Sequence, residues 1–290
     1  MENTEGETVI EPQLEIFALF GNPVAHSLSP VMHNTAFRKM NIHGQYISFC
    51  VENLEDAVRG IRGLKIRGVS VTIPFKTAVM EYLDEIDDEA LKIGAVNTIV
   101  NEGGRLTGHN TDWQGIILTL RNAMAIEGKT FVILGAGGTA RAALFGILRG
   151  GGRPVIVNRT KEKGEQLAKE WGCPFYPLEE TGKITAECLI NTTSVGMAPD
   201  TGRLPIPREL LTGYRWVMDV IYNPLKTKLL RDAEDSGCTV LSGLDMFVHQ
   251  GAEQLKLWTG REPPRDLMRQ VVQERLIAKD RGSGAGYIDK

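Results

Sequence analysis

The sequence has few cysteines and no long apolar run. Its four cysteines, Cys50, Cys173, Cys188 and Cys238, are scattered over 290 residues without a CxxC pair. This predicts buried thiols in a reducing compartment and excludes the pattern of a small disulfide framework. The five histidines form no group at metal-ligand spacing, so we expect no metal.

Other absences bear on location and partners. No apolar run approaches eighteen residues and no cationic-apolar leader is present, so we expect a cytoplasmic protein that is neither secreted nor membrane-spanning. The formal net charge is only −3, which argues against a nucleic-acid or membrane partner. The sequence does not separate an apolar face that forms a homodimer from one that fills the core, so a homodimer stays open.

Apolar runs alternate with amphipathic stretches along the chain. Strands are expected at 16–20, 45–50, 68–73 and 97–100, and helices at 30–40 and 54–63. A turn at Gly103 and Gly104 predicts a hairpin. Strands that alternate with helices predict an α/β fold with a largely parallel sheet, and the length allows two domains.

The domain boundary is expected near residues 112–127. A substrate-binding domain would comprise residues 1–112 and 247–290, and a Rossmann-like nucleotide-binding domain residues 113–246. Helices expected at 247–258 and 264–278 carry apolar positions at helical spacing and would pack back on the first domain.

The clearest motif is the apolar run from Phe131 that breaks into Gly-Ala-Gly-Gly-Thr, opens a helix and is followed by a second apolar run at 154–157. This order is typical of a dinucleotide-binding unit. Gly135 would permit the tight turn, while Gly137 and Gly138 would let backbone N–H groups approach a pyrophosphate. Because the pattern is GxGGxxR and not GxGxxG, the strand-turn-helix-strand context carries the prediction.

The second strand of this unit ends on Asn158, Arg159 and Thr160, where an NAD-binding protein usually has a carboxylate. A guanidinium suits a 2′-phosphate and gains little from a bare ribose. The sequence therefore predicts NADP as the cofactor, with an ordinary surface arginine as the alternative for Arg159.

Two serines follow the first expected strand. Ser29 stands before Pro30, which predicts a helix N-cap followed by its first turn. Ser27 and Ser29 would add hydroxyl groups to a helix N-terminus that favours anions, forming a carboxylate-binding corner. Serines that only cap the helix are the alternative.

Polar residues also stand at the ends of other apolar segments. Thr72 is expected inside a strand and Lys76 just past its end, where ligands of open α/β sheets bind. Asn97 offers both donor and acceptor to a hydroxylated ligand. Asp112 is either a ligand-facing carboxylate or the N-cap of the helix that starts at Trp113, and Lys76 is either functional or simply exposed.

Taken in order, these segments resemble the shikimate dehydrogenase family over about residues 14–262. Further marks are Asn191-Thr-Thr-Ser-Val-Gly196, Ile221-Tyr-Asn-Pro-Leu-Lys-Thr227, and Gly243 with Gln250. The resemblance implies reversible NADPH-dependent reduction of 3-dehydroshikimate, a small-molecule substrate, to shikimate in aromatic amino-acid (chorismate) biosynthesis.

The resemblance also implies residue roles. The catalytic residues would be Lys76 and Asp112. The substrate would contact Ser27, Ser29, Thr72, Lys76, Asn97, Asp112, Tyr222 and Gln250. The cofactor would contact Asp88, Gly135, Ala136, Gly137, Gly138, Thr139, Asn158, Arg159, Thr160, Lys161, Glu162, Lys163, Val220 and Gly243.

Two positions depart from the family pattern. Trp113 stands where a glycine is common, and would either narrow the pocket or pack under its helix; Val220 replaces a methionine found in some members. Two other functions stay open. One is a quinate/shikimate dehydrogenase that uses NAD, and the other is a non-catalytic NADP- or shikimate-binding module.

Overall fold

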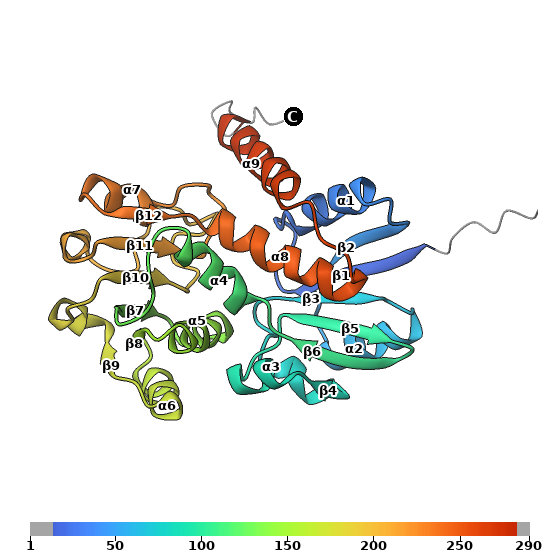
Figure 1. Cartoon of the computed structure of the whole chain (residues 1–290), viewed down its shortest axis with the longest axis horizontal. Helices are drawn as coiled ribbons and strands as arrows, with labels where there is room; N and C mark the ends of the chain where they lie inside the picture. The colour runs from blue at the N-terminus through green and yellow to red at the C-terminus, as the bar shows by residue number, and fades with distance from the viewer. Residues whose placement is uncertain (1–13, 283–290) are drawn as a thin grey trace, which may run out of the picture.

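The computed structural model describes residues 14–282, with side chains described through residue 279. The outermost residues of the predicted first domain, 1–13 and 283–290, lie outside this range. Within it, the chain forms two six-stranded sheets that lie side by side, each with its own helices (Figure 1). The predicted two-part α/β architecture is confirmed.

The amino-terminal lobe is built on a mixed sheet, in the order β2-β1-β3-β5-β6-β4. Its strands are β1 (Glu15–Gly21), β2 (Gly44–Cys50), β3 (Gly68–Val71), β4 (Glu85–Ile86), β5 (Thr98–Glu102) and β6 (Arg105–His109). Strands β1, β2 and β3 are parallel, whereas β5 is antiparallel to β3 and to β6, so the sheet is less parallel than expected. The predicted hairpin at Gly103 and Gly104 joins β5 to β6.

The second lobe is built on a fully parallel sheet, in the order β12-β11-β10-β7-β8-β9. Its strands are β7 (Thr130–Leu134), β8 (Arg153–Asn158), β9 (Phe175–Pro177), β10 (Cys188–Asn191), β11 (Trp216–Asp219) and β12 (Thr239–Leu241). Its helices are α5 (Gly138–Arg149), α6 (Lys161–Trp171) and α7 (Lys228–Asp235), with short 3-10 turns at Leu178–Lys183 and Arg208–Gly213.

Both sheets bury both faces, which explains their nearly continuous apolar strands. In β7, Phe131 and Ile133 face α4 (Asp112–Arg121), α5 and α6, while Val132 and Leu134 face α7, and all four side chains are at most 1% exposed. This two-residue alternation follows from strand geometry. On one face the mixed sheet is covered by α1 (Ser29–Lys39), α8 (Gly243–Thr259) and α9 (Arg265–Gly282). On the other face it is covered by α2 (Leu54–Gly63) and the 3-10 turn Ala78–Tyr82.

Two helices connect the lobes. Helices α4 (Asp112–Arg121) and α8 (Gly243–Thr259) pack together, and a Cβ on Gly115 of α4 would lie 2.8 Å from the Met246 carbonyl oxygen of α8. Only glycine permits so close an approach. Helix α8 crosses from the parallel-sheet lobe to the mixed-sheet lobe, and α9 (Arg265–Gly282) then packs against α1 (Figure 1). The expectation that the closing helices return to the first lobe is confirmed.

Several local predictions were wrong. Strand β3 ends at Val71, so Thr72 lies just outside it, because the chain turns there and Phe75 N–H donates to the Thr72 carbonyl. Of the four cysteines expected to be buried, Cys50 is exposed because it ends the edge strand β2, and Cys173 is half-buried. All four are free thiols. Helix α9 continues to Gly282, past the expected end at residue 278.

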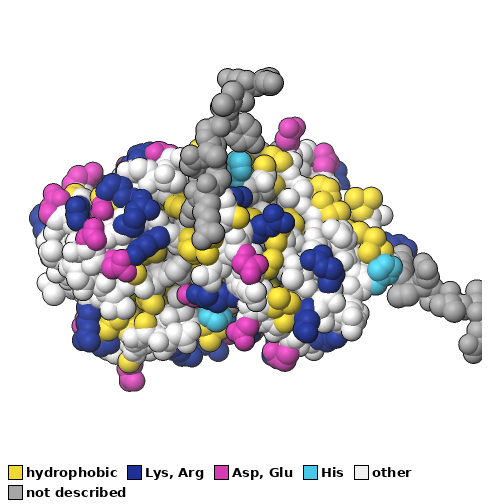
Figure 2. All heavy atoms as spheres, turned by 90° about the horizontal axis from the view of Figure 1, so that it is seen from above, with side chains coloured by type: hydrophobic (Ala, Val, Ile, Leu, Met, Phe, Trp, Pro, Cys, Tyr) yellow, Lys and Arg dark blue, Asp and Glu magenta, His cyan; other side chains and the backbone are white. Residues whose placement is uncertain are grey.

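The surface agrees with the small net charge. Figure 2 shows Lys and Arg side chains interspersed with Asp and Glu on the face seen from above, together with scattered apolar side chains. Among the described helices, none is long and apolar enough to cross a membrane.

Candidate active site

The structure joins two charged residues that are far apart in the sequence. Lys76 follows β3, Asp112 is the first residue of α4, and Lys76 Nζ lies 2.6 Å from Asp112 Oδ2. The two side chains are 14% and 4% exposed, so this ion pair, hereafter the Lys–Asp pair, is largely withdrawn from water. It lies beyond the carboxyl end of β3, where the sequence placed Lys76.

Asp112 does not act as a helix cap. The N-cap of α4 is Thr111, and no side-chain hydrogen bond caps this helix. The Asp112 carboxylate instead accepts from Lys76 Nζ at one oxygen and from Asn97 Nδ2, at 2.8 Å, at the other. The capping alternative for Asp112 is therefore excluded, and so is an exposed position for Lys76.

Asn97 is held from both ends of its amide. Its Oδ1 accepts from the Thr111 backbone N–H at 2.7 Å and from Thr98 Oγ1 at 2.8 Å. Because a backbone N–H can only donate, the atom that faces it is the oxygen, and Nδ2 must face Asp112. Gln250 Oε1 lies 3.4 Å from the same Nδ2, which brings α8 into the site.

The predicted carboxylate corner is assembled from both halves of the chain. Ser27 Oγ donates to Ser29 Oγ at 3.2 Å, and the Tyr222 hydroxyl accepts from the Leu28 backbone N–H at 3.4 Å. Burial raises the pKa of Tyr222, so its phenol keeps a proton to donate. Ser29 is not the N-cap: helix α1 begins at Ser29 with Leu28 before it, and no side-chain hydrogen bond caps it. Its hydroxyl therefore remains available to a ligand.

The glycine turn of the parallel-sheet lobe reaches the Lys–Asp pair. Lys76 Nζ donates to Thr139 Oγ1 at 3.2 Å, and a Cβ on Gly138 would lie 3.0 Å from Lys76 Cβ. Thr139 thus lies against the ammonium group, and Gly138 lies against the Lys76 side-chain stem. Thr72, just past the end of β3, lies on the same edge of the mixed sheet.

The glycine turn fits a pyrophosphate. Gly135 has φ +117°, and a Cβ there would lie 2.7 Å from Thr192 Oγ1, so only glycine is tolerated. Helix α5 has Gly137 as its N-cap with no side-chain cap, and no atom lies within 4 Å of a Cβ built on Gly137. A helix N-terminus without a side-chain cap, beside open space at Gly137, suits an anion.

Residues 158–163 form an open basic segment that runs from the end of β8 into the first turn of α6. Asn158 Nδ2 donates to the Thr160 carbonyl at 2.7 Å, which holds the turn into α6. The side chains of Arg159, Lys161 and Lys163 are exposed, as is that of Glu162. Helix α6 has no side-chain cap at Thr160, so its N-terminus is also open to an anion.

The remaining predicted cofactor residues take three different positions. Val220 follows β11 and packs against the core of the parallel-sheet lobe. Gly243 begins α8 and lies so close to Ile221 that a Cβ would be 2.4 Å from its carbonyl oxygen. Asp88 is exposed in the first turn of α3 (Asp88–Ile93), a helix that packs against α5.

Trp113 packs under its helix. Its ring meets Phe145 edge-on at 5.3 Å, and the Arg149 guanidinium lies 5.0 Å from the ring centroid. The ring belongs to the core of the parallel-sheet lobe, so it does not narrow the site beside Asp112.

Sequence reasoning missed a buried carboxylate near the site. Asp219 is 0% exposed and accepts from the Ile221 N–H, the Asn191 amide and the Thr227 hydroxyl at 3.1, 3.1 and 2.7 Å. Burial raises its pKa to about 7, although these hydrogen bonds lower it. Asp219 thereby fixes the segment that carries Val220 and Tyr222. A carboxylate that closes an apolar strand was the available signal.

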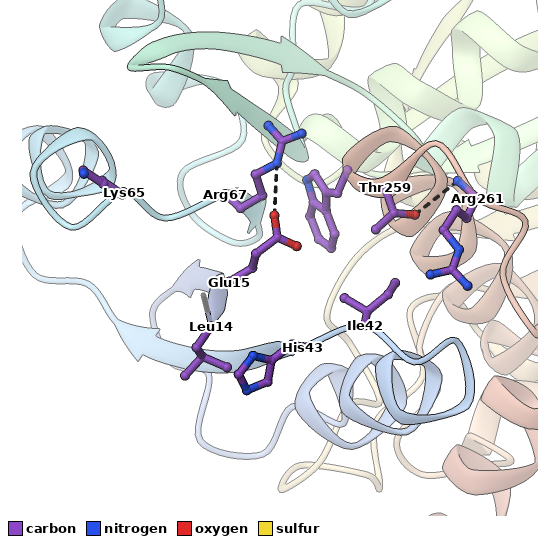
Figure 3. Close-up of a pocket in the computed structure, with 9 residues that line it drawn as sticks. Leu14, Glu15, Ile42, His43, Lys65, Arg67, Thr259 and Arg261 are labelled. Carbon is purple, nitrogen blue, oxygen red and sulfur yellow. Dashed lines mark hydrogen bonds and ion pairs between the residues drawn. The ribbon is translucent and has the colours of Figure 1, made fainter. Parts of the chain in front are cut away.

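A groove of about 550 Å³ lies elsewhere, lined by Leu14, Glu15, Ile42, His43, Lys65, Arg67, Trp258, Thr259 and Arg261 (Figure 3). Arg67 Nε lies 3.7 Å from a Glu15 carboxylate oxygen across it. The groove opens at the amino ends of β1 and β3, whereas the Lys–Asp pair lies beyond the carboxyl end of β3. This groove is therefore separate from the Lys–Asp pair. Within residues 14–282 no cluster of His, Cys, Asp or Glu could hold a metal ion.

Fold and site together define a two-lobed dehydrogenase of the Rossmann-like class, with an ammonium–carboxylate pair facing a glycine turn. The sequence matches the shikimate dehydrogenase substrate binding domain over residues 19–99 and the shikimate 5'-dehydrogenase C-terminal domain over residues 243–273.

Similar proteins agree. A shikimate dehydrogenase (NADP(+)) of Pyrococcus abyssi is 46% identical over 265 residues, covering 91% of this chain and 99% of the relative. The structure of shikimate 5-dehydrogenase from Thermus thermophilus with NADP(H) and shikimate has a TM-score of 0.82 at 37% identity, over 90% of this chain and 99% of that one. The 5-ketofructose reductase of a Gluconobacter species reaches 0.80 at 33% identity, over 90% and 99%. The chain belongs to the shikimate dehydrogenase family, as predicted.

Proposed function

We propose that this chain catalyses the reversible NADPH-dependent reduction of 3-dehydroshikimate to shikimate in aromatic amino-acid biosynthesis. The observation that carries the proposal is the Lys–Asp pair, with Nζ 2.6 Å from Oδ2, lying directly against the glycine turn of a dinucleotide-binding unit. A proton donor and a cofactor-binding turn are thereby brought to one point between the lobes. The names of the family relatives, which specify NADP(+), support this activity and cofactor.

The substrate would be oriented by its two ends. Its carboxylate would bind the carboxylate corner of Ser27, Ser29 and Tyr222, where the Ser27 hydroxyl would turn its proton from Ser29 to the ligand. Its ring hydroxyls would meet Thr72, Asn97 and Gln250, which stand around the Lys–Asp pair. Two fixed ends hold the ketone in one orientation, which is the main contribution of binding to such a reaction.

The chain's own chemistry would occur at Lys76. When NADPH is bound, its nicotinamide supplies a hydride to the ketone carbon. Lys76 Nζ would polarise the ketone oxygen and donate a proton as negative charge develops on it. Asp112 would hold the ammonium group in place, since its carboxylate is itself fixed by Asn97. In the reverse direction the same nitrogen would receive the proton.

The cofactor would lie along the edge of the parallel sheet. Residues 135–139 would hold the pyrophosphate at the N-terminus of α5, and residues 158–163 the 2′-phosphate, with Arg159 as its main partner. Val220, Gly243 and Asp88 would border the nicotinamide half. We keep the predicted division into residues 1–112 with 247–290 and residues 113–246, whose boundaries fall at the start of α4 and within α8.

The direct test is loss of NADPH absorbance on addition of 3-dehydroshikimate. NADH, quinate with NAD, and 5-ketofructose are the matched alternatives, the last because of the Gluconobacter relative. The carboxylate corner predicts that substrates with a carboxylate are strongly preferred, and Arg159 predicts preference for NADPH. Faster turnover of 5-ketofructose or of quinate with NAD would contradict the proposal.

Two further parts of the proposal concern the protein as a whole. A homodimer is supported by the edge strand β2, where Ile47 and Phe49 are 39% and 40% exposed, and light scattering tests it. A cytoplasmic location is supported by the four unpaired cysteines.

A further inference from the structure

Gln254 lies on α8 one helical turn beyond Gln250 and is only 2% exposed. Its Nε2 donates to the Asn97 carbonyl oxygen and to Thr98 Oγ1, each at 3.1 Å, and its Oε1 accepts from Ser70 Oγ at 2.7 Å. Both ends of the buried amide are thus engaged. Because a backbone carbonyl can only accept, the amide atom that faces Asn97 must be the donor Nε2.

This fixed donor sets the direction of the next hydrogen bond. Thr98 Oγ1 receives an N–H from Gln254, and its own hydroxyl proton lies toward Asn97 Oδ1 at 2.8 Å. A hydroxyl has one proton to give, so the acceptance from Gln254 and the donation to Asn97 belong together. Thr98 is 0% exposed, which leaves no water to take over either bond.

The direction then continues to the Lys–Asp pair. With Oδ1 occupied by donors, Asn97 presents Nδ2 to Asp112 Oδ1 at 2.8 Å. The other carboxylate oxygen is left for the ammonium of Lys76. The Gln254 amide, the Thr98 hydroxyl and the Asn97 amide therefore each donate in the direction of the Asp112 carboxylate.

The series of hydrogen bonds also extends from Gln254 away from the site. The Tyr46 hydroxyl donates a hydrogen bond to Ser70 Oγ at 2.7 Å, and the Ser70 hydroxyl in turn donates to Gln254 Oε1. Burial raises the pKa of Tyr46, so the phenol remains a donor. Gln254 is thus fixed by the core of the mixed-sheet lobe on one side and fixes Thr98 on the other.

We infer that Gln254 is a positioning residue for the Lys–Asp pair: it orients the Thr98 hydroxyl, which holds the Asn97 amide beside Asp112 together with the Thr111 backbone N–H. This inference rests on the proposed function, since it names how the pair is held ready for proton donation. A continuous set of buried donors limits the carboxylate to one arrangement.

The test uses Gln254→Met, which keeps length and approximate volume but removes the donor. We expect kcat to fall about tenfold, the lower end of the range for residues that orient a reacting group, with KM for NADPH unchanged. Thr98→Val interrupts the same series of hydrogen bonds at a different residue. It should have the same effect on kcat, and it provides the test if Gln254→Met does not fold. Thr98→Ser keeps the hydroxyl and should retain near-normal kcat.

Trp258→Phe is the matched control. Trp258 lies one further turn along the same helix face, is 2% exposed, and its Nε1 donates to the Ile99 carbonyl at 3.0 Å. It therefore ties α8 to β5 as Gln254 does, without a bond to Asn97. This variant should lower thermal stability while kcat stays within about twofold of the parent.

The double variant Gln254→Met/Thr98→Val separates positioning from general weakening. If Gln254 acts through Thr98, kcat of the double variant equals that of either single variant, whereas independent effects multiply to about a hundredfold. The side-chain amide resonance of Asn97, which needs no turnover, should shift in Gln254→Met and stay in place in Trp258→Phe.

The outcomes separate the role of Gln254 from the proposed function. Absence of turnover in the unsubstituted enzyme counts against the proposed function, and the Asn97 resonance then decides the positioning role. With turnover present, an unchanged kcat in Gln254→Met, a multiplied loss in the double variant, or an equal loss in Trp258→Phe would overturn the role of Gln254.

Discussion

The two ends of the candidate site are held in different ways. The Lys–Asp pair is buried, and Asp112 is fixed through Asn97 by donors from three elements of the fold. The segment of residues 158–163 is open, and its four charged residues are exposed. A reacting group gains from a preformed environment, whereas a phosphate can be bound by mobile cations that close around it. Substitutions at the first end should change kcat, and those at the second should change cofactor affinity.

The largest expected effect is that of Lys76→Ala. Removing a positioned proton donor should lower kcat about a hundredfold or more, while KM for the substrate changes little. Steady-state kinetics with 3-dehydroshikimate measure both constants. Lys39→Ala, in the exposed last turn of α1, is the control and should behave like the parent. A kcat of Lys76→Ala near that of the parent would remove Lys76 from the chemistry.

Arg159→Ala should act at the other end. Loss of a charge-assisted hydrogen bond to the 2′-phosphate should cost about 1.5–3 kcal/mol, or roughly ten- to a hundredfold in KM for NADPH. The kinetic constants for NADH and kcat at saturation should not change. Arg153→Ala, at the opposite end of β8, is the matched control. If the ratio of NADPH to NADH affinity is the same in Arg159→Ala and the parent, Arg159 does not select the cofactor.

The buried Asp219, which lies between the two ends of the site, should make the stability of the protein depend on pH. Its ordinary pKa of 3.8 rises to about 7 on folding, so the native state holds a proton that the unfolded chain releases. The free energy of unfolding should therefore fall as pH rises from about 4 to about 7. Asp219→Asn cannot titrate and should lack this fall in thermal melts, whereas Asp200→Asn, at an exposed aspartate, should keep it. Parallel curves for Asp219→Asn and the parent would show that Asp219 is charged in the native state.

His33 should have the opposite dependence. It is 0% exposed, and burial lowers its pKa from 6.5 to about 3, although the neighbouring Gln254 side chain opposes this shift. The native state resists protonation, so the free energy of unfolding should fall as pH decreases from about 6.5 toward 3. His33→Phe, which retains the stacking on Tyr46, should reduce this acid sensitivity by a small amount measurable in melts. The control His26→Phe, at an exposed histidine, should leave the acid sensitivity unchanged. If His33→Phe loses stability toward low pH as steeply as the parent does, His33 does not cause the acid sensitivity.

The comparison of the two ends also shows what the sequence could predict. The nucleotide-binding unit was recognisable because its strand, turn, helix and second strand are contiguous, and the resulting parallel sheet has them in the expected places. Lys76, Asp112 and Asn97 each end or follow an apolar segment, which marked them as candidates. Lys76 and Asn97 lie 36 and 15 residues from Asp112 in the sequence, so their contacts with Asp112 could be seen only in the folded structure.

Other features had too little local signal. The strands β4 and β9 are two and three residues long and form by pairing at sheet edges, which leaves no periodic pattern. Ser70 and Gln254 are single polar residues within apolar segments, separated by 184 positions. Such residues can be assigned a role only when the fold brings their partners together.

The most direct measurement is a crystal structure with shikimate and NADP+ bound. The account predicts the shikimate carboxylate in the carboxylate corner of Ser27, Ser29 and Tyr222, and a ring hydroxyl within hydrogen-bond distance of both members of the Lys–Asp pair. Shikimate bound instead in the groove beside Glu15 and Arg67, or with its ring turned away from Lys76, would contradict the account.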